Sequence, residues 1–438
     1  MNPTVLVATT SCWYPAARLV MALHRAGCTV DAVCPKGHPL RKTKSIRQAH
    51  AYYGLSPLAS FTRAIAISQP DLIVSGDDLA TQHLQRLYAH EKRSWKREKK
   101  DADSAICALI ERSFGDPESF PALSARATFM DLAGKEGVRV PATQVVRNLD
   151  EVKEWVGRMG LPAVLKSDGT SGGKGVRIVN TLDEAESAFE KLNSPPSLAR
   201  AAKRALLDRD KTLVWPCLLR RRPVVNLQTF VAGREATSTI FCWQGRVQAS
   251  LHFEVVKKTS SAGPSTVLRL IDNPEMSAAT EAMARRLRLS GLYGLDFMLE
   301  AESGKAYLIE INPRATQVGH LRLGPGRDIP AAFHAVLCDR AAARGDGAKA
   351  AVTDTERVTE KDTIALFPQE WIRDPESPFL RAAYHDIPWE EPDLVQHCVS
   401  SREKQSAWYR PKAAAPVAST PEPLGARAKS SSAGLGGQ

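Results

Sequence analysis

The feature that most constrains the fold is a pair of alternating segments in the third quarter of the chain. Residues 294–299 are Gly-Leu-Asp-Phe-Met-Leu, and residues 307–314 are Tyr-Leu-Ile-Glu-Ile-Asn-Pro-Arg. Polar residues interrupt both apolar segments with a period of two, which predicts two β-strands. A polar turn that contains Gly304 lies between them. Folding there as a hairpin would bring Asp296 opposite Glu310.

Glu310 and Asn312 are two residues apart, so their side chains project from the same face of a strand. Together with Asp296 they offer two carboxylates and an amide oxygen beside Arg314, and such oxygen ligands suit Mg²⁺. The alternative is a solvated hairpin face, where charged residues are common and carry no function. On spacing alone, both interpretations stay open.

A glycine-rich segment favours the metal interpretation. An apolar strand ends at Lys166, and residues 167–175 are Ser-Asp-Gly-Thr-Ser-Gly-Gly-Lys-Gly, followed by a second apolar stretch. Glycines let backbone N–H groups approach phosphate oxygens closely, and lysine adds a positive charge. The segment is not a Walker A loop, because no Ser or Thr follows Lys174 and a strand comes next instead of a helix. Taken alone, it is equally typical of a flexible hairpin tip.

Together these segments resemble the ATP-grasp superfamily, over about residues 125–323 and in the family's order. The resemblance is to the carboxylate-amine ligases and to the ATP-grasp domain of the carbamoyl-phosphate synthase large subunit. It implies an α/β (α+β) fold with three parts: an N-terminal parallel α/β pre-ATP-grasp domain, a mobile lid subdomain and a C-terminal antiparallel-sheet subdomain. The implied cofactors are ATP and Mg²⁺ (or Mn²⁺).

The resemblance also implies roles for individual residues. The implied metal ligands are Asp296, Glu310 and Asn312, and the implied catalytic residues are Arg314 and Lys166, which contact or neutralise phosphate. The implied nucleotide-binding residues are Arg126, Lys166, Ser171, Gly172, Gly173, Gln228, Thr229, Phe230, Val231 and Glu235.

Two positions depart from the family's pattern. Thr229 lies where many members carry an acidic residue that contacts the ribose. Many members also place a lysine before the helix that ends in Gly-x-x-x-Pro, and here the basic residue nearest to that position is Arg126. Arginine binds phosphate with a different geometry from lysine.

Further positions are candidates for the substrate side, and each has a plainer alternative. Ser11, Gly76 and Asp78 follow predicted parallel strands, whose carboxyl ends commonly hold ligands, but such residues more often simply form turns. A polar loop at residues 257–267 could receive the acceptor substrate or be only a surface connection. His320 follows the predicted metal strand closely enough to reach the substrate site, but a lone histidine is weak evidence.

The chain divides by composition and pattern. We expect a pre-ATP-grasp α/β domain at 1–115, an ATP-grasp domain at 116–340 with its lid at about 142–212, a C-terminal appendage at 341–410 and a disordered tail at 411–438. The elements expected are strands at 5–9 and 29–34, helices at 16–26 and 122–135, a sheet that resumes at Thr212, and an appendage whose Trp371, Trp389 and Trp408 pack on the main body.

The composition indicates which binding partners and which cellular compartment to expect. The net charge of +11 comes from dispersed clusters, so a solvated basic surface is a better interpretation than nucleic-acid binding. The 8 cysteines lack metal-ligand spacing and indicate reduced thiols in a cytoplasmic protein. No apolar run is long enough for a membrane span, and the start lacks the pattern of a secretory signal. A homodimer stays open.

The function that the resemblance implies is an ATP- and Mg²⁺-dependent ligase. It would activate a carboxylate as an acyl phosphate for attack by an amine or another nucleophile, both small molecules. The alternative is an ATP-binding protein with a regulatory or structural role and no ligase activity. A Rossmann-type NAD enzyme is a weak third interpretation, because residues 7–12 lack the glycines of the pyrophosphate turn.

Overall fold

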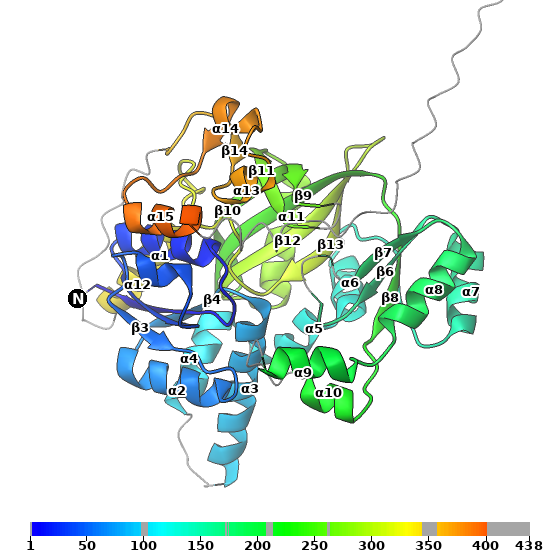
Figure 1. Cartoon of the computed structure of the whole chain (residues 1–438), viewed down its shortest axis with the longest axis horizontal. Coiled ribbons are helices and arrows are strands. Elements are labelled where there is room, and N and C mark those ends of the chain that lie inside the picture. The colour runs from blue at the N-terminus through cyan, green and yellow to red at the C-terminus, as the bar shows by residue number, and fades with distance from the viewer. Residues whose placement is uncertain are drawn as a thin grey trace, which may run out of the picture.

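A computed structural model of the chain describes residues 2–97, 104–170, 173, 175–206, 213–260, 263–343 and 357–400. Three β-sheets organise it, and helices cover their faces (Figure 1). A four-stranded sheet forms the N-terminal part, another four-stranded sheet lies at the far end, and a seven-stranded sheet lies between them. This arrangement confirms the predicted α/β (α+β) class. None of the described helices is long and apolar enough to cross a bilayer.

The N-terminal sheet is parallel, with strand order β3-β2-β1-β4. Its elements are β1 (Thr4–Ala8), α1 (Pro15–Arg25), β2 (Thr29–Cys34), the 3-10 helix η1 (Pro39–Lys42), β3 (Gln48–Ala51), α2 (Pro57–Ser68), β4 (Leu72–Ser75), α3 (Asp78–Arg97) and α4 (Ala105–Phe114). Val5, Leu6 and Val7 are fully buried, because helices cover both faces of the sheet. The strands expected at 5–9 and 29–34 and the helix expected at 16–26 are confirmed to within one residue.

The second four-stranded sheet is antiparallel, with strand order β5-β8-β6-β7, and we call it the lid sheet. Its elements are β5 (Thr143–Val146), α7 (Leu149–Met159), β6 (Ala163–Ser167), β7 (Val176–Val179), α8 (Leu182–Leu192), α9 (Leu198–Leu206), α10 (Val214–Leu218) and β8 (Val225–Thr229). Trp155, Leu165 and Leu227 belong to a core of its own. The glycine-rich segment joins β6 to β7, so the predicted hairpin is confirmed.

The seven-stranded sheet has the order β13-β12-β9-β10-β11-β14-β15 and is antiparallel except for its last pair. Its elements are β9 (Gly233–Trp243), β10 (Arg246–Lys258), β11 (Ser265–Leu270), α11 (Pro274–Arg286), β12 (Gly291–Glu300), β13 (Ala306–Asn312), α12 (Ile329–Ala343), β14 (Thr363–Ala365) and β15 (Tyr384–His385). On one face Phe297 belongs to the same hydrophobic core as Met283 of α11, and on the other Phe241 packs against Phe333 of α12. Both faces are therefore buried.

Three expectations about elements were wrong. The helix expected at 122–135 is two helices, α5 (Phe120–Ser124) and α6 (Arg126–Lys135), because Ala125 between them is extended at φ −115° and ψ 103°. A 3-10 helix, η2 (Pro117–Ser119), precedes them. Thr212, where the sheet was expected to resume, lies outside the described residues; the residues that follow it form α10, and the next strand begins at Val225. The polar loop expected at 257–267 is shorter, because β10 and β11 extend into it at both ends.

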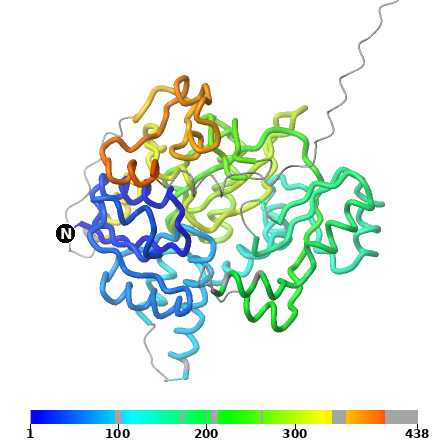
Figure 2. The backbone as a smooth tube through the Cα atoms, in the orientation of Figure 1, coloured from blue at the N-terminus to red at the C-terminus, as the bar shows by residue number. Residues whose placement is uncertain are grey.

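The C-terminal segment 357–400 returns to the N-terminal sheet, as Figure 2 shows for the orange tube beside the blue one. It contains β14, β15, α13 (Gln369–Arg373), α14 (Phe379–Ala382) and α15 (Pro392–Ser400). Phe367 packs against Tyr14 and stacks on Trp371, as expected of an appendage on the main body. Trp389 does not pack there, because it is 73% exposed. Trp408 and residues 411–438 lie outside the described residues.

Candidate functional site

The predicted hairpin brings the three oxygen-bearing side chains together. β12 and β13 pair antiparallel, with Asp296 opposite Glu310 and Gly294 opposite Asn312. The Asn312 amide nitrogen donates to Asp296 Oδ2 at 2.9 Å, and the Thr237 hydroxyl on β9 donates to Asp296 Oδ1 at 2.8 Å. The three side chains therefore converge on one face of the seven-stranded sheet.

The electrostatics of this group favour a cation. Burial and, secondly, the charge of Glu310 raise the pKa of Asp296 to about 6. Two carboxylates that repel each other in a partly buried site gain stability when a divalent cation lies between them. Carboxylate and amide oxygens are the ligands of hard cations, so Asp296, Glu310 and Asn312 fit Mg²⁺ or Mn²⁺.

Arg126, the first residue of α6, lies against Glu310. One terminal nitrogen, Nη2, donates to Glu310 Oε1 at 2.6 Å, and the other, Nη1, donates to the Ser167 carbonyl at 2.8 Å and to Asp168 Oδ1 at 3.3 Å. The guanidinium thus connects β13 to the start of the glycine-rich segment. Its Nε is buried and, among the described residues, has no hydrogen-bond partner.

Lys166 lies at the end of β6, between the lid sheet and β13. Its side chain reaches across, so that Nζ donates to the Ile309 carbonyl at 3.4 Å, and the residue is only 5% exposed. Burial lowers the pKa of Lys166 to about 8, although the neighbouring charge of Glu310 opposes that shift. A phosphate group bound here would add negative charge and so favour the protonated form of this buried amine.

Arg314 connects the hairpin to the N-terminal sheet. Its Nε donates to Asp78 Oδ1 at 2.9 Å, Nη2 donates to Asn312 Oδ1 at 3.2 Å, and the guanidinium carbon lies 5.8 Å from the Trp13 ring centroid. The Thr81 hydroxyl donates to the Pro313 carbonyl next to it at 2.8 Å. Burial opposes the charge of Arg314, but Asp78 outweighs it and raises the pKa of the guanidinium.

The implied nucleotide-binding strand is the connection between two sheets. Gln228 and Thr229 end β8, Phe230 and Val231 lie between the sheets, and Glu235 belongs to β9. The Gln228 side chain is buried and donates to the Thr143 hydroxyl at 3.0 Å, and the residue pairs with Thr143 of β5 and with Val164 of β6. The Glu235 carboxylate already accepts from Lys258 at 2.5 Å.

The glycine-rich loop is only partly described. Gly173 has φ +72° and Gly169 has φ +71°, which is the left-handed conformation that glycine adopts without strain. Ser171 and Gly172 lie outside the described residues, as does Lys174.

The structure changes the interpretation of several minor candidates. His320 is buried, and its Nε2 lies 2.6 Å from Asp386 Oδ2 of the C-terminal segment. Its hydrogen-bond partner is therefore not Asp296 or Glu310. The Ser11 backbone N–H donates to Asp77 Oδ2 at 3.2 Å, which is a turn-forming contact. Asp78, by contrast, reaches Arg314. The sequence analysis did not identify Trp13 or Thr237 as site residues. Only for Trp13 was there a signal, because it lies two residues after the candidate Ser11.

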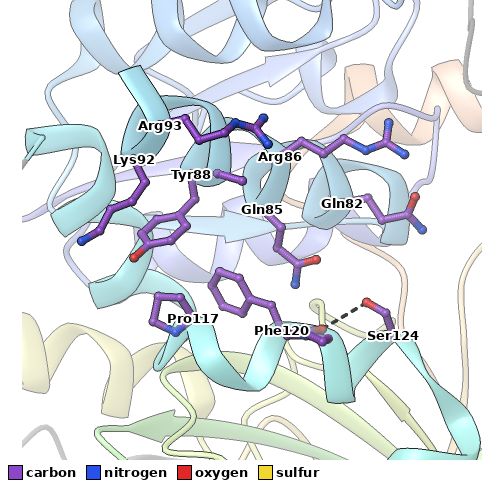
Figure 3. Close-up of a pocket in the computed structure, with 11 residues that line it drawn as sticks. Gln82, Gln85, Arg86, Tyr88, Lys92, Arg93, Pro117, Phe120 and Ser124 are labelled. Atoms are coloured by element: carbon purple, nitrogen blue, oxygen red, sulfur yellow. Dashed lines mark hydrogen bonds between the residues drawn. The ribbon is translucent and has the colours of Figure 1, made fainter. Parts of the chain in front are cut away.

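A separate surface cavity of about 640 Å³ lies between α3 and α5 (Figure 3). Gln82, Gln85 and Arg86 line it from α3, and Phe120 and Ser124 face them from α5. None of the predicted site residues that the structure describes lines this cavity. The chemistry proposed below therefore does not involve it.

Comparisons with known proteins show what this part of the chain is similar to. Residues 125–321 match the family model described as "Carbamoyl-phosphate synthase L chain, ATP binding domain". The match confirms the predicted resemblance to the ATP-grasp superfamily for this part of the chain. The matched range contains Arg126, Lys166 and the whole β12–β13 hairpin.

Two curated relatives cover the same part of the chain. The formate-dependent phosphoribosylglycinamide formyltransferase of Bacteroides thetaiotaomicron is 29% identical over 206 residues, which is 47% of this chain and 48% of that protein. The carbamoyl phosphate synthase large chain of Mesorhizobium japonicum is 23% identical over 213 residues, 46% of this chain and 18% of that protein. The chain thus spans about half of the first relative and less than a fifth of the second.

Solved structures extend the similarity of the fold beyond the ATP-grasp domain. The N5-carboxyaminoimidazole synthase of Aspergillus clavatus has a TM-score of 0.55 and 14% identity, over 82% of this chain and 80% of that one. The biotin carboxylase domain of the Hydrogenobacter thermophilus 2-oxoglutarate carboxylase has a TM-score of 0.53 and 15% identity, over 82% and 73%. At these identities the likeness concerns the fold alone.

Proposed function

We propose that the protein is an ATP- and Mg²⁺-dependent ligase that activates a carboxylate as an acyl phosphate for attack by an amine or another nucleophile. The observation that carries this proposal is the cross-strand pair of Asp296 and Glu310, with Asn312 beside them. Lys166 from the lid sheet and Arg314 from the end of the hairpin add positive charge at the same place.

Each side chain has a role that its position supports. Asp296, Glu310 and Asn312 hold the cation, which would neutralise charge on the nucleotide phosphates. Lys166 and Arg126 contact the phosphates together with Ser171, Gly172 and Gly173, and Arg314 neutralises the transferred phosphate or the carboxylate substrate. Phosphoryl transfer needs positioning and charge neutralisation more than covalent help from the protein.

The adenine and ribose would lie at the connection between the two sheets. Gln228, Thr229, Phe230 and Val231 would lie along the nucleotide there, and Glu235 would supply a carboxylate near the start of β9. Because Thr229 has no charge, the ribose hydroxyls would be held by its hydroxyl or by Glu235.

The ligands and reactions of related proteins support this choice of substrates. The Hydrogenobacter domain is described in complex with MgADP, ADP and bicarbonate. The Aspergillus synthase is described with ADP and 5-aminoimidazole ribonucleotide. A phosphoribosylamine–glycine ligase of Ralstonia nicotianae is 28% identical over 134 residues. A small acid and a small nucleophile are therefore the partners that we propose here.

The proposal extends to organisation and compartment. We divide the chain into a pre-ATP-grasp domain (1–115), an ATP-grasp domain (116–340, lid about 142–212), an appendage (341–410) and a tail (411–438). We place the protein in the cytoplasm, which agrees with cysteines that form no disulfide in the described part of the chain. A homodimer is also proposed, since the Hydrogenobacter domain is described as a dimer.

Release of ADP from ATP tests the proposal. The purified protein is screened against pooled carboxylates and amines, and the wild type is expected to release ADP only when both the acid and the nucleophile are present. Glu310→Ala should abolish turnover with the fold intact, whereas Glu302→Ala in the exposed hairpin turn should leave it unchanged. Binding of ATP without ADP release across the panel would favour the non-catalytic alternative, and full turnover by Glu310→Ala would reject the metal assignment.

A further inference from the structure

Arg126 contacts the Glu310 carboxylate, which a metal ion would also bind. Its Nη2 lies 2.6 Å from Glu310 Oε1, and the two side chains are only 13% and 29% exposed. Glu310 is one of the three residues that fit a divalent cation. A cation at this carboxylate would therefore lie within a few ångströms of a guanidinium, and at that distance in a partly buried site two positive charges repel strongly.

The rest of the guanidinium faces the lid. Nη1 donates to the Ser167 carbonyl at 2.8 Å, immediately after Lys166 and before the glycine-rich loop. Nε is buried and has no partner within the described part of the chain. A buried N–H group without an acceptor is costly, and a phosphate oxygen in front of the loop would satisfy it. The same side chain therefore meets the metal site on one side and the phosphate side of the site on the other.

We propose that Arg126 blocks Glu310 against a divalent cation until a nucleotide phosphate draws the guanidinium away. This inference rests on the proposed function and adds an order of events to it. The nucleotide exchanges one acceptor of Arg126, the Glu310 carboxylate, for phosphate oxygens, and Glu310 becomes free to bind the cation. Cation and nucleotide then strengthen each other's binding, because energetic coupling between two ligands is reciprocal.

The blocking role predicts weak cation binding in the absence of nucleotide. Free Mn²⁺ is titrated into full-length protein and followed by electron paramagnetic resonance, without nucleotide. Arg126→Gln should bind Mn²⁺ roughly tenfold more tightly than the wild type, a change in the usual range for coupled ligands. Arg139→Gln is the matched control, because Arg139 donates to Glu275 at the same distance of 2.6 Å outside the site, and it should leave Mn²⁺ affinity unchanged.

Two more variants separate charge from shape. Arg126→Met also removes the charge and should show the same gain, with folding checked by circular dichroism. Arg126→Lys keeps the charge and should bind Mn²⁺ as weakly as the wild type. Folded Arg126→Gln or Arg126→Met with unchanged Mn²⁺ affinity would overturn the proposal. Tightening in Arg126→Lys would overturn it too, because the effect would then not depend on charge.

A parallel titration with a non-hydrolysable ATP analogue separates this inference from the proposed function. Wild-type protein that binds the analogue with Mn²⁺, while Arg126→Gln shows no gain without nucleotide, overturns only the blocking role. Wild-type protein that binds neither the analogue nor Mn²⁺ overturns both.

Discussion

At the scale of single residues, burial shifts the pKa values of Asp296 and Lys166 in opposite directions. Both shifts favour the uncharged form of the side chain. The pKa of Asp296 rises to about 6 and that of Lys166 falls to about 8, in both cases chiefly because burial disfavours the charged form. Such shifts cluster where a protein receives charged ligands. A divalent cation would favour the ionised carboxylate, and a phosphate would favour the protonated amine.

The shift of Lys166 predicts proton uptake when nucleotide binds. At pH 8 the amine is about half protonated in the free protein, since its pKa is about 8. A bound phosphate raises that pKa towards the usual value of a lysine, so the complex takes up a fraction of a proton. Calorimetry in two buffers that differ in ionisation enthalpy measures this uptake at pH 8.

Two variants test whether Lys166 takes up the proton when nucleotide binds. The uptake should disappear in Lys166→Met and persist in Lys135→Met, whose lysine is exposed and paired with Asp131. A binding enthalpy that does not depend on the buffer in the wild type would contradict the assignment.

Sequence reasoning succeeded for residues that are close along the chain. Asp296, Glu310 and Asn312 share one hairpin, so a period of two and one polar turn were enough to place them together. The contact between Arg126 and Glu310 spans 184 residues, and that between Arg314 and Asp78 spans 236. Nothing in local spacing encodes such contacts, so the partners of both arginines became known only from the structure.

At the scale of elements, the connection from β8 to β9 decides how the lid sheet meets the seven-stranded sheet. Gly233 begins β9 directly after this connection, opposite Glu300. A Cβ atom on Gly233 would lie 2.0 Å from the Leu299 carbonyl oxygen, which is backbone and has little room to move. The close approach therefore requires glycine.

Gly233→Ala should destabilise the protein by about 1–3 kcal/mol, which is typical of overpacking. The free energy of unfolding in urea measures the loss. Gly157→Ala in α7 is the control, because a Cβ there meets nothing within 4 Å and alanine favours a helix, so it should be neutral or slightly stabilising. A Gly233→Ala protein as stable as the wild type would show that the strands separate here without cost.

Two of the elements that were predicted wrongly leave no clear signal in the sequence, each for its own physical reason. The apolar run around Val214–Leu218 is short, and short apolar runs do not distinguish a buried strand from one turn of helix. Pro216 is tolerated there because it lies in the first turn, where its missing N–H has no partner to lose. The break at Ala125 leaves no signature in the sequence either, since alanine is a strong helix former.

At the scale of the whole molecule, the C-terminal segment ties the N-terminal unit to the loop after the hairpin. Asp386 accepts from Arg18 of α1 and lies 2.6 Å from His320, and all three residues are buried. Burial alone would raise the pKa of Asp386, but His320 and Arg18 outweigh it and lower that pKa to about 2. The strand β14 also extends the seven-stranded sheet, which could not be predicted because its partner β11 lies over 90 residues earlier.

Asp386→Asn should lower the stability at neutral pH by about 3–5 kcal/mol, because it leaves the buried Arg18 without its counter-charge. Urea unfolding measures the change. Glu390→Gln removes a largely exposed pair with Arg25 and should cost less than about 1 kcal/mol. A loss no larger than that of the Glu390 control would show that the segment is held by apolar packing alone.

The contribution of Asp386 to stability should decrease as the pH falls. The folded-state pKa of Asp386 is below its ordinary value of 3.8, so its contribution is present above about pH 4 and is lost as the pH falls towards 2. The difference between wild type and Asp386→Asn should shrink over that window. If the difference in unfolding free energy stays constant down to pH 2, the ionised Asp386 carboxylate is not the origin of that stability.

The central claim is that Asp296, Glu310 and Asn312 together bind the cation that accompanies the nucleotide. The most direct measurement is the electron paramagnetic resonance spectrum of Mn²⁺ with a non-hydrolysable ATP analogue, recorded for wild type, Glu310→Gln and the turn variant Glu302→Gln. We predict a protein-bound Mn²⁺–nucleotide signal in the wild type and in Glu302→Gln, and its loss in Glu310→Gln. An unchanged signal in folded Glu310→Gln would contradict the account.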